Sequence, residues 1–206
     1  MSQATPTSFS FLAEHLSLDF ANTVQWHASD HPSDMLTDYE TLARWSFEAG
    51  ILDEERFDAL MEKAVRSPVE AREVHTRAIA LREAIYRICV AVIQGQIPPD
   101  PNLSTINDEL SRWRGKGRIV PMSDGFTWDY NVDLSALDSP LWPIARESAE
   151  LLTSGNIHRI GQCADDRGCG WLFLDTSKNH SRRWCDINDC GNRAKQRRYQ
   201  KRLQNK

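Results

Sequence analysis

The 206-residue chain contains no long run of apolar residues. A membrane-spanning helix needs on the order of 18 consecutive apolar residues, and no segment approaches that length. The N-terminal sequence MSQATPTSFSFLAEHLSLDF also lacks the cationic start and the apolar stretch of a secretory signal. We therefore expect a cytoplasmic protein without membrane association, whose hydrophobic content of 40% suffices for an ordinary core.

The sequence also lacks the short motifs that mark common enzyme classes. It has no glycine-rich phosphate loop, no G-x-S-x-G and no H-E-x-x-H. We therefore do not expect an enzyme. A metal-dependent nuclease is a weaker alternative, because His180 beside Asn179 is its one catalytic hint.

Acidic residues are missing after residue 190, although the whole chain carries a formal charge of −4. Residues 178–206 hold ten Lys or Arg against two Asp, a net charge of +8, while the rest carries −12. Cations without acidic partners repel one another, so this end predicts an external polyanion, most simply the phosphate backbone of DNA. The expected nucleic-acid contacts are Arg193, Lys195, Arg197, Arg198, Lys201 and Arg202.

Cysteine is scarce and unevenly distributed. Of the five cysteines, Cys89 lies in an apolar helical stripe and is expected to be an inert buried thiol. The other four form two close pairs separated by fifteen residues, which can bring four sulfurs onto one tetrahedral ion. A structural zinc site is therefore predicted, with no open position for catalysis. Its expected ligands are Cys163, Cys169, Cys185 and Cys190.

Two other uses of these four cysteines stay open. Disulfides are disfavoured, because a chain without a secretory signal is expected to stay in a reducing compartment. An iron–sulfur cluster takes the same number of thiolates, and its colour would distinguish it from zinc.

The sequence around the cysteines favours a small finger. Residues 170–175, GWLFLD, are typical of a strand, and residues 182–184, RRW, are expected to return as a second strand. A basic helix follows. Its uncharged stripe includes Tyr199 and Leu203, which we expect to dock on the finger.

Most of the preceding sequence predicts helices. Residues 37–40 read as a capping box, Asp53 as a helix cap and Pro68 as the first residue of a long helix that ends before Gly95. Further helices are expected at 103–113 and 139–153, with a hairpin at 118–130.

Two further clusters could carry function. Histidine, aspartate and asparagine residues near the N-terminus could bind a metal, although a surface loop that satisfies backbone groups explains them more simply: His15, Asp19, Asn22, His27, Asp30 and His31. Five tryptophans could line an aromatic ligand pocket, although core packing explains them more simply: Trp26, Trp45, Trp113, Trp128 and Trp142.

The cysteine-rich stretch resembles the CGNR zinc-finger family, whose name is the sequence Cys190-Gly191-Asn192-Arg193. The segment LSLDFANTV at residues 16–24 is similar to the LDF-x-NT signature of the ABATE domain. That domain is the usual N-terminal partner of the finger in bacterial proteins described as proposed stress-induced transcription regulators. The resemblance covers nearly the whole chain and implies zinc on the four cysteines and a role in DNA binding.

These observations together predict a mainly α protein. Residues 1–157 are expected to form a helical ABATE-like domain with a short β-hairpin, and residues 158–206 a zinc finger with a β-hairpin and a basic C-terminal helix. We expect a zinc-containing DNA-binding transcription regulator whose helical domain senses a ligand or forms a homodimer. An RNA-binding or protein-interaction module is the alternative.

Overall fold

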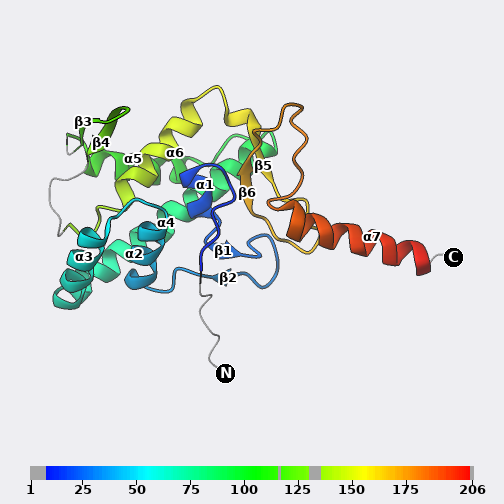
Figure 1. Ribbon diagram of the computed structural model, residues 1–206, viewed down its shortest axis with the longest axis horizontal. Coiled ribbons are helices and arrows are strands. Elements are labelled where there is room, and N and C mark those ends of the chain that lie inside the picture. Colours follow the sequence, from blue (N-terminus) through cyan, green and yellow to red (C-terminus); the bar gives the residue numbers. More distant parts are fainter. Residues whose placement is uncertain (1–7, 116, 130–135, 205–206) are drawn as a thin grey trace.

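The computed structural model describes residues 8–115, 117–129 and 136–204. The start of the N-terminal stretch and Tyr130, the last residue of the expected hairpin, lie outside these residues. The described part is mainly helical, as predicted (Figure 1). Its α-helices are α1 (Leu16–Ala21), α2 (Tyr39–Glu48), α3 (Glu54–Arg66), α4 (Pro68–Ile93), α5 (Asp100–Arg112), α6 (Leu141–Thr153) and α7 (Asn192–Gln204).

The long helix α4 is the centre of the helical part, and α1, α2, α3, α5 and α6 all pack against it. Pro68 begins α4 as expected, because the first position of a helix needs no N–H partner. The residues that α4 buries recur at steps of three and four, including Ala78, Leu81, Ile85 and Ile88. Cys89 lies on the same buried side, and burial raises the pKa of its thiol to about 12, which fits the inert role predicted for it.

The caps of α2 and α3 agree with the sequence to within one residue, whereas α5 begins three residues before the expected position. Asp53 caps α3 by accepting a hydrogen bond from the Arg56 amide, as predicted. The capping box of α2 is shifted from Thr37 to Asp38, whose carboxylate accepts from the Thr41 amide while the Thr41 hydroxyl accepts from the Asp38 amide. Aspartate fits this position well, because its short carboxylate reaches the third amide of the helix.

The strands form three antiparallel pairs: β1 (Val24–Gln25) with β2 (Ser33–Asp34), β3 (Arg118–Met122) with β4 (Gly125–Asp129), and β5 (Ile160–Gln162) with β6 (Leu172–Leu174). The hairpin predicted at residues 118–130 is thus confirmed over its described residues.

The second strand predicted for the finger is wrong. β6 lies within the predicted segment, but it pairs with β5, which precedes the first cysteine, and residues 182–184 form no strand. The reason is that Arg182 turns inward. Its guanidinium donates to the carbonyls of Leu12 and Cys185, both at 2.7 Å. This segment therefore connects the N-terminal stretch to the cysteine loop through side-chain hydrogen bonds and does not pair as a strand.

The hydrophobic core continues from the helices into the finger. Ile160 of β5 and Leu172 of β6 are buried in one cluster with Leu81 and Ile85 of α4. The finger therefore closes one end of the helical core. The division of the chain at residues 157 and 158 stays a prediction.

Helix α7 projects away from the rest of the molecule (Figure 1) and buries none of its residues. Tyr199 is 64% exposed and Leu203 is 56% exposed, so the expected docking of these two side chains is wrong. Two apolar side chains, even as neighbours on one face, offer too little area to hold a helix so rich in cations against the finger. Among the described helices, α7 included, none is long and apolar enough to span a membrane.

Candidate metal centre and basic helix

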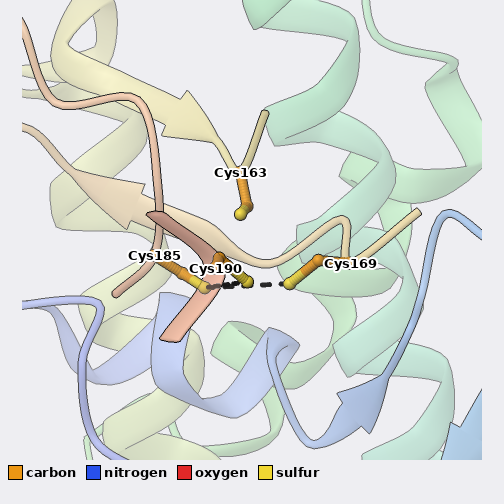
Figure 2. Close-up of side chains that lie close together, drawn as sticks. All are labelled: Cys163, Cys169, Cys185 and Cys190. Atoms are coloured by element: carbon orange, nitrogen blue, oxygen red, sulfur yellow. Dashed lines mark hydrogen bonds between the residues drawn. The ribbon is translucent and has the colours of Figure 1, made fainter. Parts of the chain in front are cut away.

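The four predicted cysteines converge on one point, although they come from three separate segments (Figure 2). Cys163 follows β5, Cys169 precedes β6, and Cys185 and Cys190 flank the turn that leads into α7. Their sulfur atoms all lie within 4.8 Å of one another, and all four residues are buried.

The sulfur geometry fits a single zinc ion. A tetrahedral Zn²⁺ with Zn–S bonds of about 2.3 Å requires sulfurs about 3.8 Å apart. The Cys169 and Cys185 sulfurs are 3.7 Å apart, and those of Cys185 and Cys190 are 3.6 Å apart. These separations are too long for disulfides, whose sulfurs lie about 2 Å apart, and all the cysteines are free. A cluster of several irons distributes its cysteines over different metal atoms and needs wider spacing. The four cysteines thus fit a structural zinc site.

The charge of this site also favours a dication. Burial raises the pKa of Cys190, and the neighbouring thiolates raise it further, because another negative charge would join those already present. A bound Zn²⁺ stabilises the thiolates and removes this penalty. Arg193 contributes as well, because its Nη2 lies 2.9 Å from the Cys190 sulfur and donates to it. The last residue of the CGNR sequence therefore supports a metal ligand directly.

The N-terminal segment holds the finger by a pair of hydrogen bonds from one asparagine. Asn22, just after α1, donates from Nδ2 to the Leu172 carbonyl at 2.9 Å. Its Oδ1 accepts from the Leu172 amide at 2.8 Å. The side-chain amide thus occupies a free edge of β6, as a neighbouring strand would. The LDFANT signature therefore contains, in Asn22, a residue that holds the finger by hydrogen bonds.

A second contact joins the loop after β1 to the knuckle that carries Cys169. The His27 amide donates to the Cys169 carbonyl at 3.1 Å, and the Ala28 amide donates to the Gly168 carbonyl at 3.2 Å. Gly168 and Gly170 have φ values of +87° and +72°, and a Cβ on either would lie under 3 Å from the Ala28 backbone. Glycine is required at both positions for conformation and for space.

The histidine and aspartate residues near the N-terminus do not form a metal site. Within the described residues, the four cysteines are the one group of metal-ligating side chains that converges. Asp19 accepts from the Ala13 amide at 2.9 Å, and His27 stacks on Tyr86 with ring centroids 3.6 Å apart. The simpler interpretation of these residues is thus correct for Asp19 and Asn22, which satisfy buried backbone groups.

The five tryptophans separate into three environments. Trp45 is fully buried in the core beside Phe20. Trp26 packs on the cysteine cluster and lines a pocket of about 320 Å³ beside it. Trp142 contacts the rings of Trp113 and Trp128, and these three line a pocket of about 510 Å³ beside β4. A single aromatic pocket made of all five is therefore wrong, and packing accounts for most of them.

The six cations predicted to contact nucleic acid divide into two groups. Arg197 forms ion pairs with Asp165 at 2.9 Å and with Asp166 at 2.6 Å, and Arg193 pairs with Asp165 and Asp189. These two arginines therefore anchor α7 to the finger. The other four are exposed and have no ion pair among the residues that the structure describes: Lys195, Arg198, Lys201 and Arg202.

Sequence reasoning missed the partners of the two anchors. Asp165 has a fully buried side chain, and with Asp166 it lies between the first two cysteines in the stretch CADDRGC. The repulsion expected along α7 is thus partly relieved by carboxylates from elsewhere in the finger. A pair of acids inside a metal-binding loop is the signal that could have indicated this.

Two family models match the chain. Residues 14–155 match the ABATE family, described as "Putative stress-induced transcription regulator", and residues 159–203 match the CGNR zinc finger. No curated protein matches the chain. The matched ranges hold the LDFANT contact and all four cysteines. The chain belongs to the ABATE family and carries a C-terminal CGNR zinc finger.

Proposed function

We propose that this protein is a DNA-binding transcription regulator that places α7 against the duplex. The observation that supports this proposal is the cluster of unpaired cations on the exposed face of α7. At about 100° per residue, the four unpaired cations fall on an arc of roughly 120°, whose centre lies about 120° around the helix from the anchors Arg193 and Arg197. A helix of 13 residues is about 20 Å long, and the major groove, about 12 Å wide, admits such a helix.

The zinc site would give this helix a fixed direction. α7 begins two residues after Cys190, and Arg193 in its first turn contacts both the Cys190 sulfur and Asp165. Metal binding therefore orders the base of the helix before DNA arrives, which lowers the entropic cost of association.

The free cations would contact phosphates, which position a protein on DNA without reading its sequence. Lys195, Arg198, Lys201 and Arg202 are the proposed contacts, and Arg193 and Arg197 would act by holding the helix. The helical domain would sense a ligand or form a homodimer, and a dimer could address two half-sites. Such a regulator would work in the cytoplasm, without catalytic activity.

The test is fluorescence anisotropy of zinc-loaded protein with a labelled mixed-sequence duplex over a series of salt concentrations. Replacing Lys195 and Arg202 by Ala should weaken binding and reduce the salt slope by about 0.9 for each phosphate that the variant no longer neutralises. Arg72→Ala is the control, because Arg72 is an exposed arginine on α4, away from the finger. It should leave the slope unchanged.

Competition between the DNA duplex and structured RNA distinguishes the proposed function from its main alternative, an RNA-binding module. Stronger binding to RNA than to the duplex would favour an RNA-binding module. Absence of duplex binding at low salt would overturn the proposal and direct attention to protein partners.

A further inference from the structure

A small cationic pocket lies where the loop before Cys185 meets the first turns of α7. Its volume is about 170 Å³, which is enough for a phosphate group. The residues around it are Ala164, Asp166, Arg183, Trp184, Ala194, Arg197, Arg198 and Lys201. Four of these are cations and one is an acid, so the pocket favours an anion.

Ion pairs inside the finger neutralise only one of the four cations. Arg197 is satisfied by Asp166 and by the buried Asp165 behind it. Arg183, Arg198 and Lys201 have no ion pair within the described ranges. The pocket therefore keeps three positive charges close to one another, and this repulsion is relieved when an anion enters.

The loop that carries Arg183 is fixed in place. The Arg183 carbonyl accepts from the Ala164 amide at 2.8 Å, which ties this loop to the residue after the first cysteine. The Arg183 guanidinium lies over the Trp184 ring, 5.3 Å from its centroid. Stacking of this kind pre-orients a guanidinium and leaves its N–H groups available.

Two residues that line the pocket also carry spare donors. The Trp184 Nε1 and the Arg197 Nε are buried and have no hydrogen-bond partner among the described residues. Buried donors are nearly always satisfied in proteins, and an unpaired one calls for an explanation such as a bound water or ion. An oxyanion in the pocket has the acceptors that these donors lack.

We propose that this pocket binds one backbone phosphate of the nucleic acid, held by Arg183, Arg198 and Lys201. Arginine forks bind phosphate oxygens in a bidentate manner, and lysine adds a point charge. This proposal rests on the proposed function and deepens it, because Arg183 lies outside α7. The interface thus extends onto the finger loop and fixes the register of the helix on the duplex.

A strand of nucleic acid fits the pocket better than a free phosphate ion. Arg198 lies about 40° from Arg202 and about 60° from Lys195 around the helix axis, so the cations of the pocket continue into the outer face of α7. A polyanion can contact both groups at once, whereas a single ion occupies only the pocket.

The decisive variant fills the pocket without changing any charge. Ala194 is a small residue on the wall formed by α7, and Ala194→Leu places a larger side chain there at a position where leucine is a good helix former. Arg183→Ala removes one cation from the loop. Both variants should lower the salt slope for duplex binding by about 0.9 and weaken binding at least about threefold at moderate salt. Arg72→Ala is again the control, because it removes a positive charge far from the pocket.

Zinc content and far-UV circular dichroism of each variant should equal those of the wild type, which shows that the finger is intact. If Ala194→Leu disturbs the finger, Arg183→Ala and Arg183→Lys together carry the test. Lysine should restore most of the slope and only part of the affinity, because it keeps the charge and loses the bidentate geometry.

The outcomes separate the two proposals. Absence of duplex binding by the wild type would overturn the proposed function. A slope that falls in Lys195→Ala but not in Arg183→Ala or Ala194→Leu would overturn the pocket alone. Binding of inorganic phosphate is the last measurement. If phosphate binds the wild type and not Arg183→Ala, while the two proteins have equal salt slopes for duplex binding, the pocket holds a free ion. The proposal that it binds a backbone phosphate would then be wrong.

Discussion

The contact between Asn22 and Leu172 allows a quantitative test of how the finger is held. The two residues are 150 positions apart, and Asn22 is 4% exposed while Leu172 is fully buried. Asn22→Ala removes both hydrogen bonds and adds no new group. The Leu172 amide and carbonyl are then left without their partner on the outer edge of β6.

The expected cost follows from this burial. Each hydrogen bond contributes about 0.5–1.5 kcal/mol net, but a buried donor or acceptor that is left unsatisfied costs about 1–3 kcal/mol. One donor and one acceptor lose their partner, so we expect a loss of about 2–6 kcal/mol in the free energy of unfolding. A domain is stable by only about 5–15 kcal/mol, so the change should be large.

The assay is urea unfolding of zinc-loaded protein, followed by far-UV circular dichroism. Asn107→Ala is the matched control, because Asn107 is an exposed asparagine on α5 and should change stability by no more than about 0.5 kcal/mol. A second readout is zinc transfer to a chromophoric chelator. It should be faster in Asn22→Ala, because β6 continues from the loop that carries Cys169. A cost below about 1 kcal/mol would refute this reasoning.

Three further predictions concern a buried acid, the ion pair of a buried arginine and the metal. Burial raises the pKa of Asp19 from 3.8 to about 6, so the folded state binds more protons than the unfolded chain between these values and loses stability as pH rises. Compared with Asp19→Asn, the wild type should lose about 1.4 kcal/mol between pH 5 and pH 7.5 in urea unfolding, and parallel profiles would contradict this. Asp34→Asn removes the bidentate partner of Arg82, which is 3% exposed but keeps its ion pair with Glu83, and should cost about 1–2 kcal/mol by the same assay, whereas Glu40→Gln in an exposed pair should cost little. Cys190→Ser should lower the zinc content measured by mass spectrometry and reduce duplex affinity; undiminished affinity would mean that zinc does not organise α7.

Much of this protein is determined by local sequence. Pro68 and Asp53 mark helix starts because their effect depends on the backbone of the next turn alone. The four cysteines are identified by their spacing, because two close pairs of thiols suit a tetrahedral ion. The basic character of α7 is likewise visible in the sequence, since no acid follows residue 190.

Only the tertiary structure decided how these parts meet. The sequence suggested a strand at residues 182–184, but Arg182 finds carbonyl partners as distant as Leu12, and β5 takes the place of that strand. The LDFANT signature carries no local sign that Asn22 binds Leu172. Contacts of this kind depend on which surfaces the core brings together, and the core includes both helices and finger strands.

The same holds for the six cations of α7, which the sequence presents as equivalent. Arg193 and Arg197 differ from the others because they face Asp165, a buried acid some thirty positions earlier in the chain. Composition determined that this end of the protein is cationic. The fold determined which charges are neutralised inside the finger and which remain for a partner, because an ion pair depends on distance in space and not on position in the chain.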